Sequence, residues 1–250
     1  MAEYPITVDT LPPPYRDGFV ALANTLRVLA GENLLGLCAF GGWLAGDPFF
    51  AGTPGRSVVV LRRIDLRMLD RLATSGAKFG RRNLRAPLIM TPEYVRSSCD
   101  TFPLELLEIQ QTHVVVCGAD YFADLRFEPR HVRLQCEREF KSELIQLRQG
   151  LLAAAGRRKL LGTLCLDVAE RTLRVLRGVL YLADASQTAG PSAALVRQVA
   201  AHTRLGLPAL ERLVAGRPEI GLPEFEALYQ DIAQLAGYID ELPTPAASAP

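Results

Sequence analysis

The chain has 250 residues, of which 49% are hydrophobic, and its 28 Lys and Arg residues nearly balance its 27 Asp and Glu residues. This length and apolar fraction allow one large hydrophobic core or two smaller ones, as in a folded globular protein. A formal net charge of +1 provides no overall field that would attract nucleic acid or an anionic membrane, so the net charge does not indicate a nucleic-acid partner.

The sequence gives no sign of a membrane protein. No apolar run approaches the roughly 18 residues of a transmembrane helix, and the first 15 residues do not have the order of a signal peptide. We therefore expect a cytoplasmic protein without a membrane partner. The five cysteines are widely spaced, without the close pairs of zinc or redox sites, and are expected to be mostly buried, reduced thiols. They are Cys38, Cys99, Cys117, Cys136 and Cys165.

The first half of the chain alternates between helical and strand patterns, which predicts an α+β domain. Apolar residues recur at helical spacing from Phe19 to Leu29. Apolar strands are predicted at residues 34–40 and 57–62, and a helix over residues 64–77.

Two further strands are predicted before residue 110. The first covers residues 85–90 and leads to Thr91, which is in position to cap a short helix that begins at Pro92. Residues 102–109 are expected to form the second, with Pro103 at its beginning or on a sheet edge because proline cannot donate to the ladder.

From residue 131 the pattern is helical almost throughout. A long amphipathic helix, with apolar residues every three or four positions from Val132 to Leu151, is expected to link two domains. Residues 160–182 are apolar on most faces, which is typical of a central helix in a bundle. Shorter helices are expected over residues 193–202, 208–215 and 225–239.

A glycine pair follows the first apolar strand. Gly41 and Gly42 would allow the backbone to turn tightly and to approach a phosphate closely, although glycine pairs are also common between ordinary elements. The strand after the pair carries no carboxylate, since no Asp or Glu occurs between Asp47 and Asp65.

Several short segments occur in an order that resembles a known family. The chain resembles bacterial predicted nucleotidyltransferases of the polymerase-beta-like superfamily with a helical C-terminal domain, over roughly residues 15 to 240. This resemblance implies an α+β fold in which a nucleotidyltransferase-like mixed sheet with flanking helices is followed by an α-helical bundle. The segments are Phe40-Gly41-Gly42, the strand at 57–62, Pro87 to Tyr94, Asp100 to Glu105, His113 with Cys117-Gly118, residues 134–139, and Leu147-Arg148.

The resemblance also defines the expected domains. Residues 1–14 would be an N-terminal extension, 15–130 the nucleotidyltransferase-like domain, and 131–242 the linker helix and helical bundle. The tail, 243–250, contains only Pro, Thr, Ala and Ser and is expected to be disordered because it has nothing to bury.

The resemblance implies a binding site of five residues around a metal site that has lost its ligands. Gly41 matches the glycine of the family's Gly-Ser turn, which holds a nucleotide phosphate, and Gly42 replaces the serine. Arg56 and Ser57 lie where the family has paired magnesium-binding aspartates, and neither supplies a carboxylate. Glu105 matches a later acidic position, which we expect on a strand beside the strand at 57–62, without another carboxylate close to it.

Three other features have ordinary explanations. Glu108 would point to the face of a regular strand opposite Glu105, so the two would not form an acid/base pair. Trp43 and the loop 46–55 are expected to pack against their own domain. The stripe of Arg171, Arg174 and Arg177 is expected to be solvated or paired within the chain.

The leading functional interpretation is a pseudoenzyme. It is a nucleotidyltransferase-like protein with a degenerate metal site, with no catalytic residues and no metal or other cofactor, that binds a nucleotide or acts in assembly through a protein partner at its helical bundle. One alternative is an active nucleotidyltransferase that uses magnesium and transfers NMP from an NTP to a small molecule, protein or RNA. Another is one subunit of a toxin–antitoxin-like pair.

Overall fold

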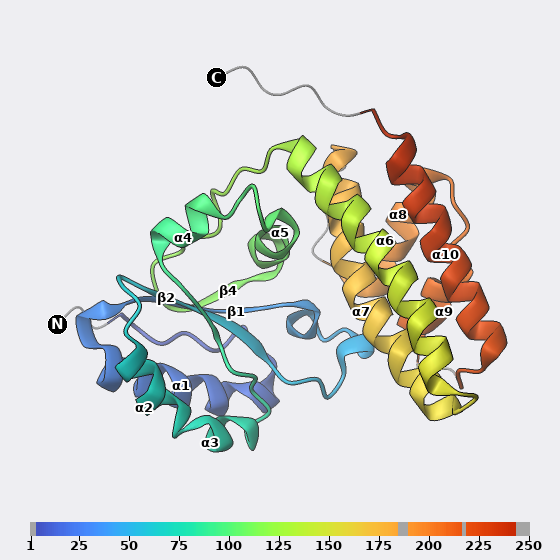
Figure 1. Cartoon of the computed structure of the whole chain (residues 1–250). Coiled ribbons are helices and arrows are strands. Elements are labelled where there is room, and N and C mark those ends of the chain that lie inside the picture. Colours follow the sequence, from blue (N-terminus) through green and yellow to red (C-terminus); the bar gives the residue numbers. More distant parts are fainter. Residues whose placement is uncertain (1–3, 185–189, 217–218, 244–250) are drawn as a thin grey trace. The chain divides into compact units, whose positions relative to one another are not determined.

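The computed structural model describes residues 4–184, 190–216 and 219–243. The protein is α+β and divides into two compact units (Figure 1). One comprises Met1–Cys99 with Glu108–Arg126 and contains a small mixed sheet; the other comprises Asp100–Leu107 with Phe127–Pro250 and is helical. Of the tail expected to be disordered, residues 244–250 lie outside the described residues.

The sheet has four strands in the order β3-β2-β1-β4. The central strand β1 pairs antiparallel with both β2 and β4, and β2 pairs parallel with β3. The predictions of β1, β2 and β3 are confirmed, whereas β4 was not predicted even though Val114, Val115 and Val116 are strong strand formers. The strands are β1 (Leu34–Phe40), β2 (Arg56–Leu61), β3 (Leu88–Met90) and β4 (Val114–Gly118).

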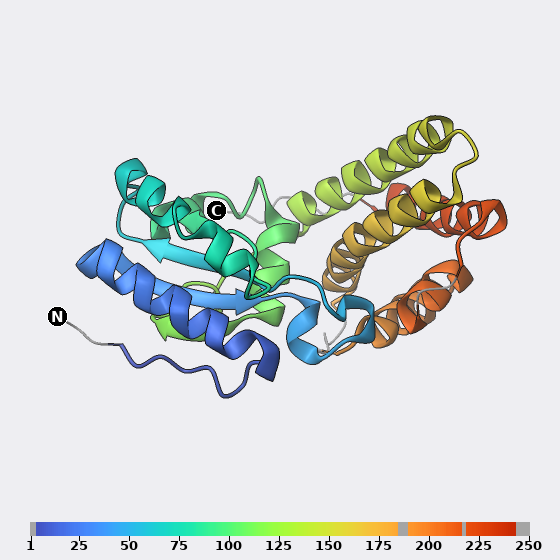
Figure 2. The ribbon, with the colours of Figure 1, turned by 90° about the horizontal axis from the view of Figure 1, so that it is seen from below.

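Helix α1 (Pro13–Ala30) places its predicted apolar stripe in the core of the sheet-containing unit. Phe19, Leu22 and Leu26 are at most 1% exposed and share one cluster with residues of β1 and β2. Helix α2 (Leu66–Ala73) lies beside α1 on the same side of the sheet, as Figures 1 and 2 show.

The prediction of a single helix over residues 64–77 is wrong, because α2 ends at Ala73 and a short helix α3 (Gly76–Gly80) follows. Thr74, Ser75 and Gly76 are weak helix formers. The Thr74 hydroxyl also donates to the carbonyl of Arg71 at 2.7 Å, a local bond that accompanies the end of α2. After β3, the predicted cap is confirmed: Thr91 Oγ1 accepts from the Tyr94 N–H at 3.1 Å at the start of α4 (Pro92–Ser97).

The prediction of a strand at residues 102–109 is wrong, since these residues form most of helix α5 (Pro103–Thr112). Proline is favoured at the first helical position, and leucine, glutamate and glutamine are good helix formers. The pattern resembled a strand because four apolar side chains are at most 1% exposed and cover several faces of the helix. These are Leu104, Leu106, Leu107 and Ile109.

This correction also changes the positions of the two glutamates. Glu105 is not on a strand beside β2, whose neighbours are β1 and β3. Glu105 and Glu108 are one helical turn apart on α5, so they do not occupy opposite faces of a strand.

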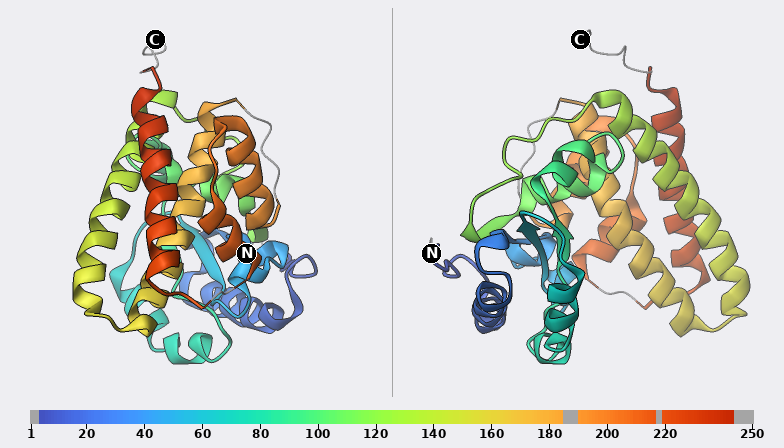
Figure 3. Two further views of the ribbon diagram at one scale, coloured as in Figure 1. Left: turned by 90° about the vertical axis from the view of Figure 1, so that its right-hand side faces the viewer. Right: turned by 60° about the vertical axis from the view of Figure 1, so that its left-hand side comes forward.

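The helical unit contains the helices predicted from the second half of the sequence. Its central helix α7 is buried on several faces and packs against α6, α8 and α10; Figure 3 shows α6, α7 and α10 alongside one another. The helices are α6 (Pro129–Ala154), α7 (Arg158–Leu182), α8 (Ser192–Thr203), α9 (Pro208–Ala215) and α10 (Leu222–Glu241).

A buried carboxylate joins the last two of these helices. Asp231 on α10 is 1% exposed, and its Oδ2 accepts from the N–H groups of Ala209 and Leu210 at 2.9 Å each. It thereby satisfies two of the donors that the start of α9 leaves without helical partners. Across the described part of the chain, no helix has the length and apolar character needed to cross a membrane.

Candidate functional site

The glycine turn lies at the end of the central strand, as predicted. Strand β1 ends at Phe40, Gly41 has a φ of 110° that favours glycine, and a short 3-10 helix, η2 (Gly42–Ala45), follows through Trp43 and Leu44. The Gly41 N–H donates to Thr112 Oγ1 on α5 at 2.9 Å. This backbone donor is therefore already used within the protein.

The space beside Gly42 is filled by an aromatic side chain. A Cβ at this position would collide with the ring of Phe50, which the 3-10 helix η3 (Pro48–Phe50) presents to it. Asp47 fixes the start of η3 by accepting from the Phe49 N–H at 2.9 Å. A serine, which the resembled family has here, would therefore require Phe50 to move.

Arg56, the first residue of β2, forms a bidentate ion pair with Glu108 on α5. The two bonds measure 2.7 Å from Nη1 to Oε1 and 3.0 Å from Nη2 to Oε2. The side chains are only 20% and 9% exposed, and the guanidinium lies 4.4 Å from the centre of the Phe40 ring. A bidentate, charge-assisted pair of this kind holds both side chains in one geometry, and the charges of its guanidinium and carboxylate cancel.

Ser57 lies on the opposite face of the same strand. Side chains alternate along β2, and the neighbouring residues Val59 and Leu61 belong to the core cluster that contains α1. Ser57 is 2% exposed, and its hydroxyl has no hydrogen-bond partner among the described residues. It therefore cannot contact the same small ligand as Arg56 without a rearrangement of the strand.

Glu105 interacts within the helical unit. Its Oε1 accepts from Arg174 Nη1 at 3.2 Å, and its Oε2 accepts from Gln135 Nε2 at 2.7 Å. One member of the predicted arginine stripe is thus paired within the chain; a second, Arg171, donates to Gln146 at 2.6 Å.

Of the five predicted site residues, the structure brings the Gly41-Gly42 turn and Arg56 together. A Cβ at Gly41 would lie 3.6 Å from Arg56 Nη1. Glu108 and Thr112, which belong to this cluster, were not among the predicted site residues. Reading residues 103–112 as a helix would have placed both on one face, four residues apart; their bond, from Thr112 Oγ1 to the Glu108 carbonyl, measures 2.6 Å.

The aromatic side chains near the turn pack as expected. The Trp43 indole donates to the Phe40 carbonyl at 2.8 Å, and its ring contacts Tyr15 and Phe19. Trp43 is 4% exposed, so it does not offer an open face to a base.

Neither a metal site nor a reactive thiol is evident near the turn. Over the described ranges, no group of three or more His, Cys, Asp or Glu side chains is arranged to hold a metal ion. Burial raises the pKa of the Cys38 thiol on β1 to about 12, which keeps it protonated and unreactive at neutral pH.

The sequence matches no protein-family model, and no curated protein matches it.

Proposed function

We propose that the protein is a nucleotidyltransferase-like pseudoenzyme that acts in assembly with a protein partner. The bidentate pair between Arg56 and Glu108 carries this proposal, because it lies on the strand where the resemblance implies paired aspartates. A mixed sheet with flanking helices, and a glycine turn at the end of β1, are compatible with a nucleotidyltransferase-like domain and support the proposed ancestry.

The chemistry of this pair opposes nucleotidyl transfer. Magnesium requires several oxygen ligands, whereas a guanidinium offers only donors and a positive charge. Glu108 does bring a carboxylate to this place, but both of its oxygens accept from Arg56. A metal ion bound there would have to displace a partly buried ion pair.

Two contacts at the turn favour assembly over nucleotide binding. The Gly41 N–H, which would otherwise be available to a phosphate, donates to Thr112. The Phe50 ring occupies the space next to Gly42 that a phosphate-binding serine would need. The proposed role therefore uses the fold as a scaffold; a toxin–antitoxin-like pairing would be one form of it.

Activity assays test this proposal directly. We expect no transfer of label from ATP, GTP, CTP or UTP to the protein or to added small-molecule, protein or RNA acceptors, with either magnesium or manganese. We also expect no thermal shift with these nucleotides; a ligand at 100 times its Kd would add about 2.7 kcal/mol to the stability. A shift that persists in chelator would favour the nucleotide-binding version, and metal-dependent label transfer would overturn the pseudoenzyme.

A pair of variants tests whether Arg56 is structural. Arg56→Met should lower the free energy of unfolding by about 3 kcal/mol, because it leaves Glu108 without its guanidinium partner. Adding Glu108→Leu should recover most of that loss, since an apolar pair can replace a buried ion pair. If Arg56→Met folds with unchanged stability, the ion pair is not a structural replacement for a metal site, and the pseudoenzyme proposal loses its main support.

A further inference from the structure

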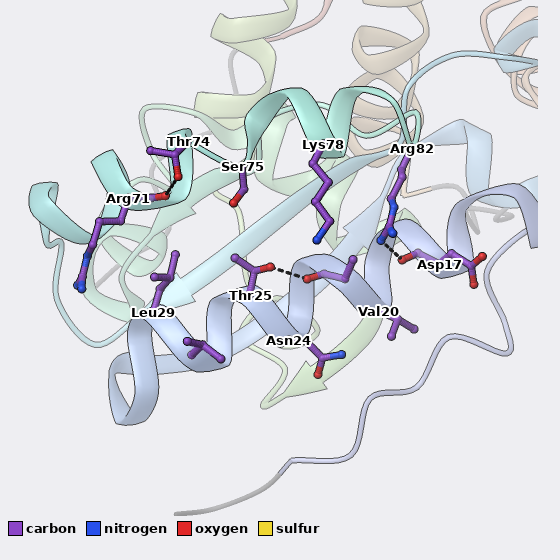
Figure 4. A pocket seen from close by; sticks show the side chains of 12 residues that line it. Asp17, Val20, Asn24, Thr25, Leu29, Arg71, Thr74, Ser75, Lys78 and Arg82 are labelled. Carbon is purple, nitrogen blue, oxygen red and sulfur yellow. Dashed lines mark hydrogen bonds between the residues drawn. The ribbon is translucent and has the colours of Figure 1, made fainter.

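A groove of about 870 Å³ runs between α1 and the α2–α3 segment in the sheet-containing unit (Figure 4). Its α1 wall extends from Asp17 to Leu29, which corresponds to about 18 Å along the helix axis. The opposite wall carries Arg71, Lys78 and Arg82. Figure 4 shows Lys78 pointing across the groove toward α1, while Arg82 at one end donates to the Asp17 carbonyl at 3.1 Å.

The cationic wall belongs to the most basic segment of the chain. Residues 62–85 contain eight Arg and Lys residues and two Asp residues, a net charge of +6 in a protein whose formal charge is +1. Among the described residues, no carboxylate forms an ion pair with any of these eight cations. Asp65 is used elsewhere, because its Oδ1 accepts from the Arg67 and Met68 N–H groups at the start of α2. Within the described part of the chain, the cations of this wall are therefore not paired with carboxylates.

The α1 wall combines this charge with aliphatic surface. Val20 and Ala21 line it near one end, and Val28 and Leu29 lie about two helical turns further along, with the polar Asn24 and Thr25 between the two pairs. Val28, in the last turn of α1, is 84% exposed and so is open to contact by a ligand. The groove therefore offers an aliphatic stripe, interrupted by one polar turn, parallel to a row of cations.

We propose that this groove binds an acidic amphipathic helix of a partner protein. Leucine-like side chains spaced seven or eight residues apart would contact the two aliphatic pairs of the α1 stripe, and flanking Asp or Glu residues would lie against Arg71 and Lys78. A length of about 18 Å accommodates about three turns of such a helix.

Single-stranded nucleic acid fits the groove less well. Unpaired bases are held mainly by stacking on aromatic side chains, and none of the described residues that line the groove is aromatic. A lone phosphate would leave the aliphatic stripe uncovered.

Selection from random libraries tests the proposal on the full chain. We would select displayed random 16-residue peptides, and in parallel random 16-nucleotide single-stranded RNAs, on the wild-type protein at low salt. We expect enriched peptides that are acidic and carry apolar residues at helical spacing, and no enriched RNA. Enrichment of RNA alone, of peptides without acidic residues, or of nothing would overturn the proposal.

Matched variants then locate the binding surface. The double charge reversal R71E/K78E should lower the affinity for an enriched peptide by about tenfold or more, because two attractive contacts become repulsive. The reversal R62E/R63E changes the net charge equally, but at exposed positions outside the groove, and should have a much smaller effect.

A second matched pair tests the aliphatic stripe. Val28→Asp should lower the affinity for the same peptide by about tenfold, since it places a carboxylate in the apolar contact. Leu66→Asp, at a residue that is 75% exposed and outside the groove lining, should have little effect. Equal effects within either matched pair would overturn the assignment to the groove. None of these four variants alters Gly41, Arg56 or Glu108, so the outcome is independent of the nucleotidyl-transfer assays.

Discussion

Glu143 shows how strongly a single residue can depend on its surroundings. It lies on α6 and is 1% exposed, and its Oε2 accepts from Thr172 Oγ1 on α7 at 2.9 Å. Burial raises its pKa to about 8 and Glu139 adds to the rise, although the Thr172 hydrogen bond and the charges of Arg171 and Arg174 oppose it. In the folded protein at neutral pH the carboxyl is therefore mostly protonated.

This pKa makes a pH dependence of stability testable. Because the pKa is about 8 in the folded state against an ordinary 4.5, unfolding releases a proton between these values. The contribution of Glu143 to the free energy of unfolding is greatest below pH 4.5. It declines as pH rises toward 8, by at most about 1.4 kcal/mol per pH unit. Glu143→Gln should remove this decline in urea unfolding measured from pH 5 to 8.5, whereas Glu226→Gln, at an exposed position of α10, should keep it. A stability difference between wild type and Glu143→Gln that is constant over this pH range would contradict the prediction.

At the scale of elements, the sequence predicted helices and strands well where either the hydrophobic period or the length of the apolar segment was clear. The helices α1, α6, α8, α9 and α10 show a helical hydrophobic period, β1 and β2 are short unbroken apolar runs, and α7 is an apolar segment too long for a strand; all of these predictions are confirmed. The prediction for residues 102–109 failed because the short helix α5 is buried on several sides, so its apolar residues show neither a helical nor a strand period clearly.

That failure also limited the prediction of the candidate site. The turn at Gly41 follows from local sequence, and its position is confirmed. The partner of Arg56 depends instead on a contact between residues 52 positions apart, which only the fold establishes. Single-sequence patterns contain no record of such pairings.

Two glycines of α7 provide a test of close helix packing. A Cβ at Gly178 would collide with Leu104 of α5 and lie 2.7 Å from Cys136 Sγ of α6, whereas a Cβ at Gly162 would have only Ile220 as a neighbour, at 4.0 Å. Gly178→Ala should therefore lower the free energy of unfolding by about 1–3 kcal/mol through overpacking. Gly162→Ala should raise it by about 0.5–1 kcal/mol, because alanine favours the helix. Denaturant unfolding measures both, and a Gly178→Ala variant as stable as Gly162→Ala would contradict the packing.

At the scale of the whole molecule, the helical unit is discontinuous in sequence. It takes Asp100–Leu107 from before the last strand of the sheet, in addition to the segment from Phe127 onward. Within this unit, the Leu104 N–H donates to Gln135 Oε1 at 2.9 Å, and Glu105 binds Gln135 and Arg174. A boundary drawn at one point of the chain, such as the one expected between residues 130 and 131, would separate these groups from their partners.

Fragments of the chain test how much this segment contributes. A fragment of residues 100–243 should be more stable than a fragment of residues 127–243 by about 2–4 kcal/mol, because it retains the burial of Leu104, which is 1% exposed, and the contacts of Glu105. Urea unfolding followed by circular dichroism measures the difference. The double variant Leu104→Ala/Glu105→Ala in the longer fragment serves as the control and should remove most of the gain. If both fragments unfold at the same urea concentration with equal slopes, residues 100–107 do not stabilise the bundle, and the helical unit is contained in the segment from Phe127 onward.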